Sequence, residues 1–176
     1  ENGRYTIEAL LGEGGMGNVY RAMDNRLGRQ VALKVLHAEL ISHPTARKRM
    51  TQEANALARI GHRNVVRIFD VFDDGPCLVL ALELITGGSL EEALTKEKME
   101  EAAALQMMEE ILTGLQAIHD AGLVHRDIKP ANILLDGNTP KLTDLGIAHD
   151  STRRGETRLG ARLGTPEYMS PEQHRG

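Results

Sequence analysis

The first half of the chain alternates apolar and polar residues with a period of two, which predicts β-strands. Three segments rich in aliphatic and β-branched residues are separated by glycine-rich or Asn/Gly turns: Tyr5 to Gly12, Gly17 to Asp24 and Arg29 to Leu36. Two further strands, Val65 to Phe72 and Leu78 to Leu84, flank the turn signal Asp73 to Pro76. The pattern therefore predicts an antiparallel sheet of five strands.

One helical pattern interrupts these strands, because apolar residues recur every three or four positions after Pro44. We expect a helix from Pro44 to about Ile60, ended by Gly61. Its apolar face carries Met50, Ala54, Leu57 and Ala58. Glu53 falls on the same side, where a solvated glutamate is not expected.

Beyond Gly88 the apolar spacing is helical. Ser89, followed three residues later by Glu92, forms a capping-box pattern. A longer helix follows, and its apolar positions are Leu105, Met108, Leu112, Leu115 and Ile118. Gly122 should end this helix, and residues 133–143 read as a small hairpin turning at residues 136–138. Residues 151–163 have no periodicity and predict a loop. The change of period indicates an α+β fold with parts at 1–85 and 86–176.

Composition and charge exclude several functions. The chain has 176 residues, of which 41% are hydrophobic and 26% charged, as in soluble globular proteins. Its 21 basic and 25 acidic residues give a net charge of −4, which argues against nucleic-acid binding. The single Cys77 excludes an internal disulfide and fits the reducing cytoplasm. No apolar run is long enough to span a membrane, although a start at Glu1 looks trimmed and leaves room for an anchor elsewhere in a longer parent.

Residues 12–19 match the pattern G-x-G-x-x-G-x-V, with Gly12, Gly14 and Gly17 at the fixed positions and Gly15 between them. Alone, the pattern is equally compatible with a flexible hairpin turn. A dinucleotide fingerprint would lead from a strand into a helix, whereas this one leads from strand to strand. Glycines let backbone N–H groups approach phosphate oxygens closely, so we favour a phosphate-binding hairpin.

Lys34 interrupts the apolar strand from Val31 to Leu36. If the strand lies at the edge of the sheet, Lys34 simply faces water. If the strand is central, the ammonium group needs an anionic partner, because an unpaired buried charge is costly. Glu53 is the candidate partner.

A polar stretch at residues 125–132 matches H-R-D-x-x-x-x-N, and Asp144 follows twelve residues after Asn132. Two carboxylates and an amide at this spacing suit Mg²⁺ and the orientation of a hydroxyl group. The other histidines, among them His37, show no metal-ligand spacing and predict surface or core roles.

The ordered motifs resemble those of eukaryotic-type protein kinases, in particular bacterial serine/threonine-protein kinases. The resemblance rests on residues 12–19, 31–34, 53, 125–132, 144–146 and 170–172. It implies a two-lobe protein-kinase-like fold, with a five-stranded antiparallel sheet and one helix in the N-terminal lobe and a mainly helical C-terminal lobe. The family continues beyond Gly176, so we expect an incomplete C-terminal lobe, uncovered apolar surface and little transfer by the 176-residue piece alone.

The resemblance also implies a role for each matched position, with ATP and Mg²⁺ as cofactors and Mn²⁺ as an alternative ion. Lys34 would hold the phosphates and pair with Glu53, and Asp127 would orient the substrate hydroxyl. Asn132 and Asp144 would bind the metal, and Lys129 indicates transfer to serine or threonine. The remaining nucleotide contacts would be Leu11, Gly12, Gly14, Gly15, Gly17, Val19, Ala32, Glu83, Ile85 and Leu134.

Regulation and partners follow from the same resemblance. Arg126 would receive a phosphate on the loop, with Thr157 as the expected autophosphorylation site and Thr165 near the loop's end. Leu145 replaces the family's usual phenylalanine. Protein substrates are implied, and a homodimer would allow autophosphorylation in trans. Two alternatives stay open: a small-molecule kinase, which residues 164–172 disfavour because they resemble a peptide-docking loop, and a nucleotide-binding or scaffold fragment without transfer activity.

Overall fold

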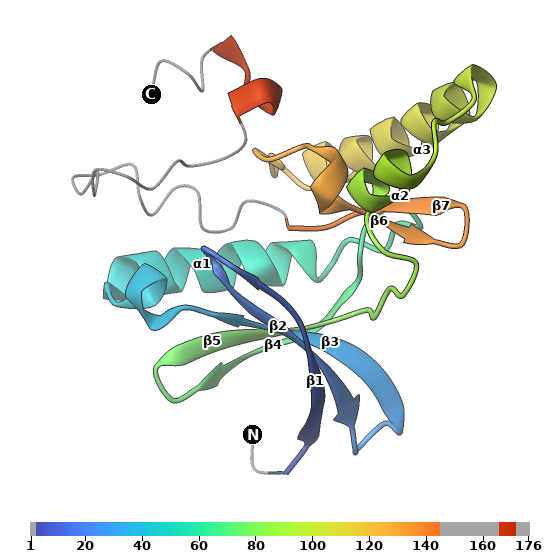
Figure 1. Cartoon of the computed structure of the whole chain (residues 1–176). Helices are drawn as coiled ribbons and strands as arrows, with labels where there is room; N and C mark the ends of the chain where they lie inside the picture. Colours follow the sequence, from blue (N-terminus) through green and yellow to red (C-terminus); the bar gives the residue numbers. More distant parts are fainter. Residues whose placement is uncertain (1–2, 145–165, 172–176) are drawn as a thin grey trace. The chain divides into compact units, whose positions relative to one another are not determined.

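A computed structural model describes residues 3–144 and 166–171 (Figure 1). Contacts within the chain divide it into two compact units. The first comprises Glu1–Gly61 and Val66–Ile85, and the second comprises His62–Val65 and Thr86–Gly176. In the described part of the chain, no helix combines the length and apolar character needed to cross a membrane.

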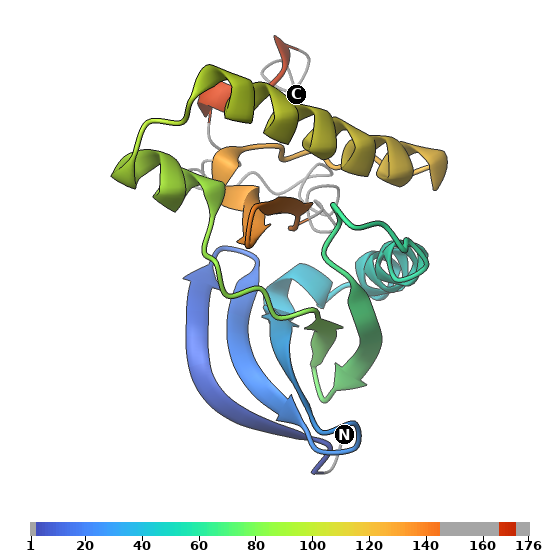
Figure 2. The same ribbon diagram turned by 90° about the vertical axis from the view of Figure 1, so that its right-hand side faces the viewer.

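The first unit is a five-stranded antiparallel sheet with one α-helix, as the sequence pattern predicts. Its strands are β1 (Tyr5–Gly14), β2 (Gly17–Asp24), β3 (Arg29–Leu36), β4 (Ile68–Asp74) and β5 (Cys77–Leu82). Their order in the sheet is β1-β2-β3-β5-β4, so β3 is central and Lys34 is not on an edge strand. In the sequence, a short 3-10 helix, η1 (Ala38–Ile41), and the helix α1 (Pro44–Leu57) follow β3 and precede β4, and Figure 2 shows α1 nearly end-on beside the sheet.

Five boundaries differ from the prediction by two residues or more, and two of these are the ends of β1 and β4, which lie two residues later than predicted, at Gly14 and Asp74. Helix α1 ends at Leu57, because Arg59 and Ile60 make tight-turn bonds to the carbonyls three residues before them. Strand β4 begins at Ile68, and Val65 forms instead an isolated bridge with Leu142 of the second unit. Strand β5 ends at Leu82, two residues earlier than expected.

The two faces of the sheet are covered differently. On one face Ala22, Val31, Leu33, Val79 and Ala81 form a buried cluster. Side chains alternate along a strand, so Lys34, Leu78 and Leu80 point to the opposite face. Helix α1 contacts β4 and β5 and buries Met50, Ala54 and Leu57. The apolar side of α1 is thus the side that the sequence predicts.

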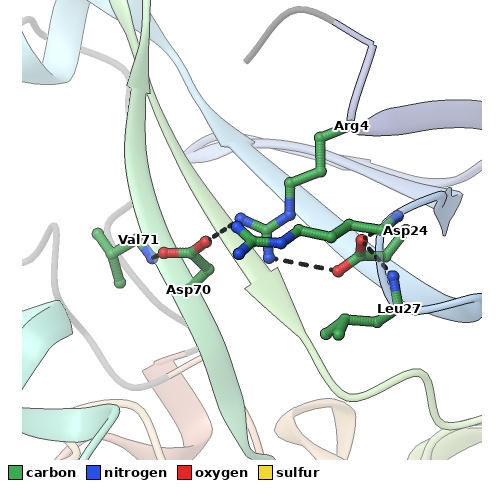
Figure 3. Close-up of polar contacts among 6 residues, drawn as sticks. Arg4, Asp24, Leu27, Asp70 and Val71 are labelled. Atoms are coloured by element: carbon green, nitrogen blue, oxygen red, sulfur yellow. Dashed lines mark hydrogen bonds and ion pairs between the residues drawn. The ribbon is translucent and has the colours of Figure 1, made fainter.

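The outer strands β1 and β4 are tied to each other although they are opposite ends of the strand order. The rings of Tyr5 and Phe72 stack with centroids 5.4 Å apart. The Arg4 guanidinium donates to Asp70 and, at 3.3 Å, to Asp24 (Figure 3). The sheet is therefore coiled enough to bring side chains of its two edges together.

Asp24 is buried beside Arg4 and also accepts hydrogen bonds from the backbone N–H groups of Arg26 and Leu27 at the β2–β3 turn. Burial alone would raise the pKa of this carboxyl group. The hydrogen bonds from Arg4 and from the turn outweigh burial, so the pKa of Asp24 lies below its usual value and the group stays ionised.

The second unit contains the predicted helices and hairpin. Its elements are α2 (Leu90–Lys96), α3 (Glu101–Asp120), the 3-10 helix η2 (Pro130–Asn132), β6 (Ile133–Asp136), β7 (Thr139–Leu142) and the 3-10 helix η3 (Pro166–Tyr168). The Ser89–Glu92 capping box at the start of α2 has both of its hydrogen bonds. The β6–β7 turn is one residue shorter than predicted, because Asp136 pairs with Thr139.

The apolar face expected for the long helix is only partly the buried one. Ile118 is buried as predicted, but the other buried positions of α3 are Ile111 and Gly114. Leu105 is 67% exposed, and Met108 and Leu112 are also exposed. We call Leu105, Met108 and Leu112 the α3 apolar face.

Asn64 determines which side of α3 is buried. Its side-chain amide donates to the Pro140 carbonyl at 2.9 Å and to the Glu110 carboxylate at 3.0 Å. The backbone carbonyl of Asn64 accepts from the backbone N–H of Leu142 at 2.8 Å. A Cβ at Gly114 would lie 2.8 Å from this same carbonyl oxygen, so only glycine fits there without a shift. The short segment His62–Val65 is therefore packed into the second unit.

Candidate nucleotide-binding and catalytic residues

The glycine-rich residues form the tip of the β1–β2 hairpin, where Gly14 pairs with Gly17. Gly17 has a φ of +151°, and a Cβ there would lie 2.2 Å from the carbonyl oxygen of Val35. Packing against β3 therefore explains this glycine. A Cβ at Gly12 or Gly15 would meet no atom within 4 Å. These two positions leave open space beside the backbone, which is what a close ligand would need.

His37 fixes the hairpin tip to the end of β3, a role that the sequence pattern does not indicate. Its Nε2 lies 3.0 Å from the Gly14 carbonyl oxygen, and its backbone N–H donates to the Met16 carbonyl at 3.2 Å. No metal-binding or catalytic spacing marks His37. Only the observation that it follows β3 directly could have suggested a contact with the hairpin.

Val19, Ala32 and Lys34 share one face of the sheet. Val19 pairs directly with Lys34 on the neighbouring strand, so their side chains lie on the same face. Ala32 lies two residues before Lys34 on β3 and therefore shares this face. That side is the one opposite the buried cluster containing Leu33. Lys34 is half-buried on it, as is Glu53 on α1. The register thus supports the predicted Lys34–Glu53 pair, which stays a prediction.

The other nucleotide candidates of the first unit lie near strand ends. Leu11 is exposed next to an irregularity of the β1–β2 register. Glu83 follows β5, and its backbone N–H donates to the Arg67 carbonyl at 2.8 Å. Its carboxylate accepts in turn from the backbone N–H of Arg67 at 3.3 Å. Ile85 closes the first unit.

In the second unit the structure brings Asp127, Lys129 and Asn132 together. Nζ of Lys129 lies 2.9 Å from Oδ2 of Asp127. Nδ2 of Asn132 donates to the same carboxylate oxygen at 2.7 Å and to the Asp127 carbonyl at 2.8 Å. The 3-10 turn Pro130–Asn132 creates this geometry by folding the chain back on Asp127. The result is an oriented carboxylate with a cation beside it.

The backbone around this cluster is constrained. Arg126 and Asp144 have φ angles of +68° and +54°, which non-glycine residues adopt at a cost. The neighbouring His125 is buried and its Nδ1 accepts from the Asp127 N–H at 3.4 Å. Burial lowers the pKa of the His125 imidazole, so the ring is neutral at physiological pH. Such strain is typical of functional sites.

Asp144 is held near Asn132, because the N–H of its neighbour Thr143 donates to the Asn132 carbonyl at 3.0 Å. Both Nδ2 contacts of Asn132 use the amide nitrogen, so its side-chain carbonyl oxygen is the atom able to bind a cation. Among the described residues no cluster of three or more metal-ligating side chains occurs. A carboxylate and an amide oxygen fit Mg²⁺ nevertheless, because this ion is commonly bound by one or two protein groups together with substrate phosphates.

The remaining candidates are divided between described and undescribed positions. Leu134 lies on β6 and pairs with Ser89. Arg126 is exposed. The regulatory candidates Thr157 and Thr165 fall outside the described residues, as do Leu145 and Glu172.

A family model described as "Protein kinase domain" matches residues 5–175. The chain therefore belongs to the protein kinase family, in agreement with its glycine-rich hairpin, its lysine strand and its Asp127 loop.

Curated relatives narrow the similarity to serine/threonine kinases of bacteria. Serine/threonine-protein kinase pkn2 of Myxococcus xanthus is 40% identical over 179 residues, covering 98% of this chain and 22% of the relative. Serine/threonine-protein kinase PknL of Mycobacterium tuberculosis is 41% identical over 174 residues, covering 98% of this chain and 44% of the relative. The chain thus spans less than half the length of these relatives.

Solved structures confirm the predicted fold. The kinase domain of Mycobacterium tuberculosis PknI superposes with a TM-score of 0.75 at 27% identity, covering 84% of this chain and 61% of that one. Rad53 in complex with AMP-PNP gives a TM-score of 0.80 at 25% identity, covering 98% of this chain and 43% of that one.

Proposed function

We propose that this chain is the catalytic part of an ATP- and Mg²⁺-dependent kinase that transfers the γ-phosphoryl group to serine or threonine hydroxyls of proteins. The observation that carries the proposal is the Asp127 cluster, in which one carboxylate is oriented by Asn132 and Lys129. Family membership and relatives named serine/threonine-protein kinases support the substrate class.

In the first unit, the nucleotide would bind to the sheet face that carries Val19, Ala32 and Lys34 and to the tip of the β1–β2 hairpin. Gly12 and Gly15 would admit phosphate oxygens to the backbone, while Val19 and Ala32 would line the apolar side of the nucleotide. Lys34, which we expect to pair with Glu53, would contact the phosphates. The N–H of Glu83 is already used by Arg67, so adenine recognition here would fall to the Glu83 carbonyl and to the backbone of Ile85.

In the second unit, Asp127 would accept a hydrogen bond from the attacking hydroxyl. It would take up the proton as the oxygen bonds to the γ-phosphorus and the bond from that phosphorus to the departing ADP breaks. Lys129 would neutralise charge beside the transferred group. Asn132 and Asp144 would hold Mg²⁺, which supplies charge neutralisation of the phosphates. The work of the protein is then positioning and electrostatic stabilisation rather than covalent chemistry.

Regulation and assembly belong to the same proposal. A phosphate on Thr157 would pair with Arg126, since a phosphate accepts strong charge-assisted hydrogen bonds from a guanidinium group. Thr165 would lie close to the bound substrate. Autophosphorylation in trans would require a homodimer, at least transiently. The single Cys77 favours a cytoplasmic location for this part of the protein.

A transfer assay with γ-³²P-ATP and a generic basic protein, run beside a nucleotide-binding titration, tests the proposal. Lys34→Met and Asp144→Asn should each abolish transfer. Asp127→Asn should abolish transfer while nucleotide affinity changes little, because the carboxylate acts on the hydroxyl and not on ATP. Full activity of the Asp127→Asn protein would refute the assignment.

The same assay separates the alternatives. Nucleotide binding without transfer to any protein, including the chain itself, would indicate a nucleotide-binding or scaffold role. Consumption of ATP that depends on an added small hydroxyl compound, and not on protein, would indicate a small-molecule kinase.

A further inference from the structure

The guanidinium group of Arg47, in the first turn of α1, is bonded to the hairpin that joins β4 to β5. Its Nη2 and Nε lie 2.6 and 3.2 Å from Oδ1 of Asp73. Its Nη1 donates to the Pro76 carbonyl at 3.2 Å, and its Nη2 donates to the Cys77 carbonyl at 3.3 Å. We call these contacts, between Arg47, Asp73 and the two carbonyls, the Arg47 clasp.

The clasp is more specific than an ordinary surface ion pair. An exposed pair of long side chains contributes little, because solvent screens it and its geometry varies. Here the Arg47 side chain is only 28% exposed, and its guanidinium is shared between a carboxylate and backbone carbonyls of one tight turn. A planar group with several fixed donors can bind this set at once, whereas the point charge of a lysine could not. The adjacent Lys48 is exposed.

The clasp lies in the first turn of α1, where it can affect the direction of the whole helix. The buried side chains of α1 are Met50, Ala54 and Leu57, all in the second half of the helix or at its middle. The first turn, which begins at Pro44, has no buried apolar side chain and is attached to the sheet through Arg47. A helix is stiff over this length, so the first turn helps to fix the direction of the whole helix.

Glu53 is carried by the same helix, less than two turns beyond Arg47. A change in helix direction moves Glu53 relative to β3 and therefore relative to Lys34. We propose that Arg47 is a positioning residue, which holds α1 in the direction that lets Glu53 pair with Lys34. The proposal rests on the proposed kinase function, but its structural half concerns α1 alone and can be tested without nucleotide.

The first test compares transfer rates. Arg47→Ala and Asp73→Ala should each lower kcat/KM for ATP by about tenfold, a typical size for coupling between contacting groups. Lys48→Ala, a charge removed from the neighbouring exposed position, is the matched control and should leave the rate unchanged. In a Glu53→Gln background, Arg47→Ala should cause no further loss, because the pair through which Arg47 acts is already absent.

The second test measures hydrogen exchange of the nucleotide-free protein by mass spectrometry. Arg47→Ala should increase exchange in peptides from residues 44–57 and 73–78 and leave β1 and β2 unchanged, whereas Lys48→Ala should match the wild type. This arm stands even if the wild-type chain transfers no phosphate, a result that would count against the kinase function alone.

Three outcomes would overturn the proposal. The first is an Arg47→Ala protein with unchanged α1 exchange. The second is increased exchange with wild-type kcat/KM, which would make the clasp purely structural. The third is that Arg47→Ala lowers kcat/KM by the same factor in the wild type and in the Glu53→Gln background, which would mean that Arg47 does not act through Glu53.

Discussion

Removing the side chain of Asn64 should destabilise the second unit more than its place in a short connecting segment suggests. The change Asn64→Ala deletes the amide nitrogen that donates to the Pro140 carbonyl and to the Glu110 carboxylate, and the amide oxygen that accepts from the Thr113 hydroxyl at 3.4 Å. Asn64 is only 1% exposed, so water cannot easily replace the lost donors. The backbone carbonyl of Asn64, which accepts from Leu142, is unaffected.

The magnitude follows from these contacts. A neutral hydrogen bond contributes about 1 kcal/mol and one to a charged group about 1.5–3 kcal/mol, and Glu110 is partly exposed, so the lower end applies to it. We expect a loss of about 2–4 kcal/mol in the free energy of unfolding. For a chain of 176 residues this corresponds to a fall in Tm of about 6–12 °C.

Urea denaturation followed by far-UV circular dichroism, together with thermal melts, would measure this loss. Asn138→Ala, in the exposed turn of the β6–β7 hairpin, is the matched control and should change stability by less than about 0.5 kcal/mol. If Asn64→Ala shifts the midpoint no more than Asn138→Ala does, the buried network around Asn64 does not stabilise the fold and our reading of it is wrong.

Three further predictions concern other parts of the chain. Burial lowers the pKa of His125 in the folded state, so on acidification the unfolded chain takes up this proton first. The contribution of neutral His125 to the free energy of unfolding should be complete above about pH 6.5 and decline below it. Unfolding measured at several pH values should show a smaller decline for a His125→Leu variant. Gly17→Ala should cost about 2 kcal/mol or more because its Cβ would overlap the Val35 carbonyl, whereas Gly15→Ala should keep the same Tm and instead weaken ATP binding in a titration. Changing the α3 apolar face to glutamine should raise the soluble, monomeric fraction in size-exclusion chromatography, and an unchanged elution profile would mean that this face does not drive association.

The local signals in the sequence predicted most of the elements correctly. Alternating apolar residues identified the five strands, and the Ser89–Glu92 pair marked the start of α2, because these signals depend only on neighbouring residues. The fixed spacing from Asp127 to Asn132 likewise predicted a cluster that the structure brings together through a 3-10 turn. The cluster of Asp127, Lys129 and Asn132 could therefore be predicted from the sequence, because its residues lie close together along the chain.

What could not be predicted depends on contacts between distant segments. Val65 looks like part of β4, yet it pairs with Leu142, which lies 77 positions away (142 − 65). The buried positions of α3 are Ile111, Gly114 and Ile118, and the packing of Gly114 on Asn64 decides this side of the helix. Periodicity alone identifies apolar positions such as Leu105 but does not say which of them are buried. Arg47 reads as one of several charges on a solvated helix, and only the fold of the β4–β5 hairpin gives it partners.

The packing of His62–Val65 into the second unit has a consequence for protein engineering. The polypeptide passes from one unit to the other after residue 61, returns after residue 65 and leaves again after residue 85. A chimera could join the N-terminal half of one kinase to the C-terminal half of another at residue 85. Its Asn64 and Val65 would then come from one kinase, while the residues that they contact in the second unit would come from the other. Compatible halves need two exchanged segments rather than one, so recombination at a single crossover should yield fewer folded proteins than recombination that keeps residues 62–65 with residues 86–144.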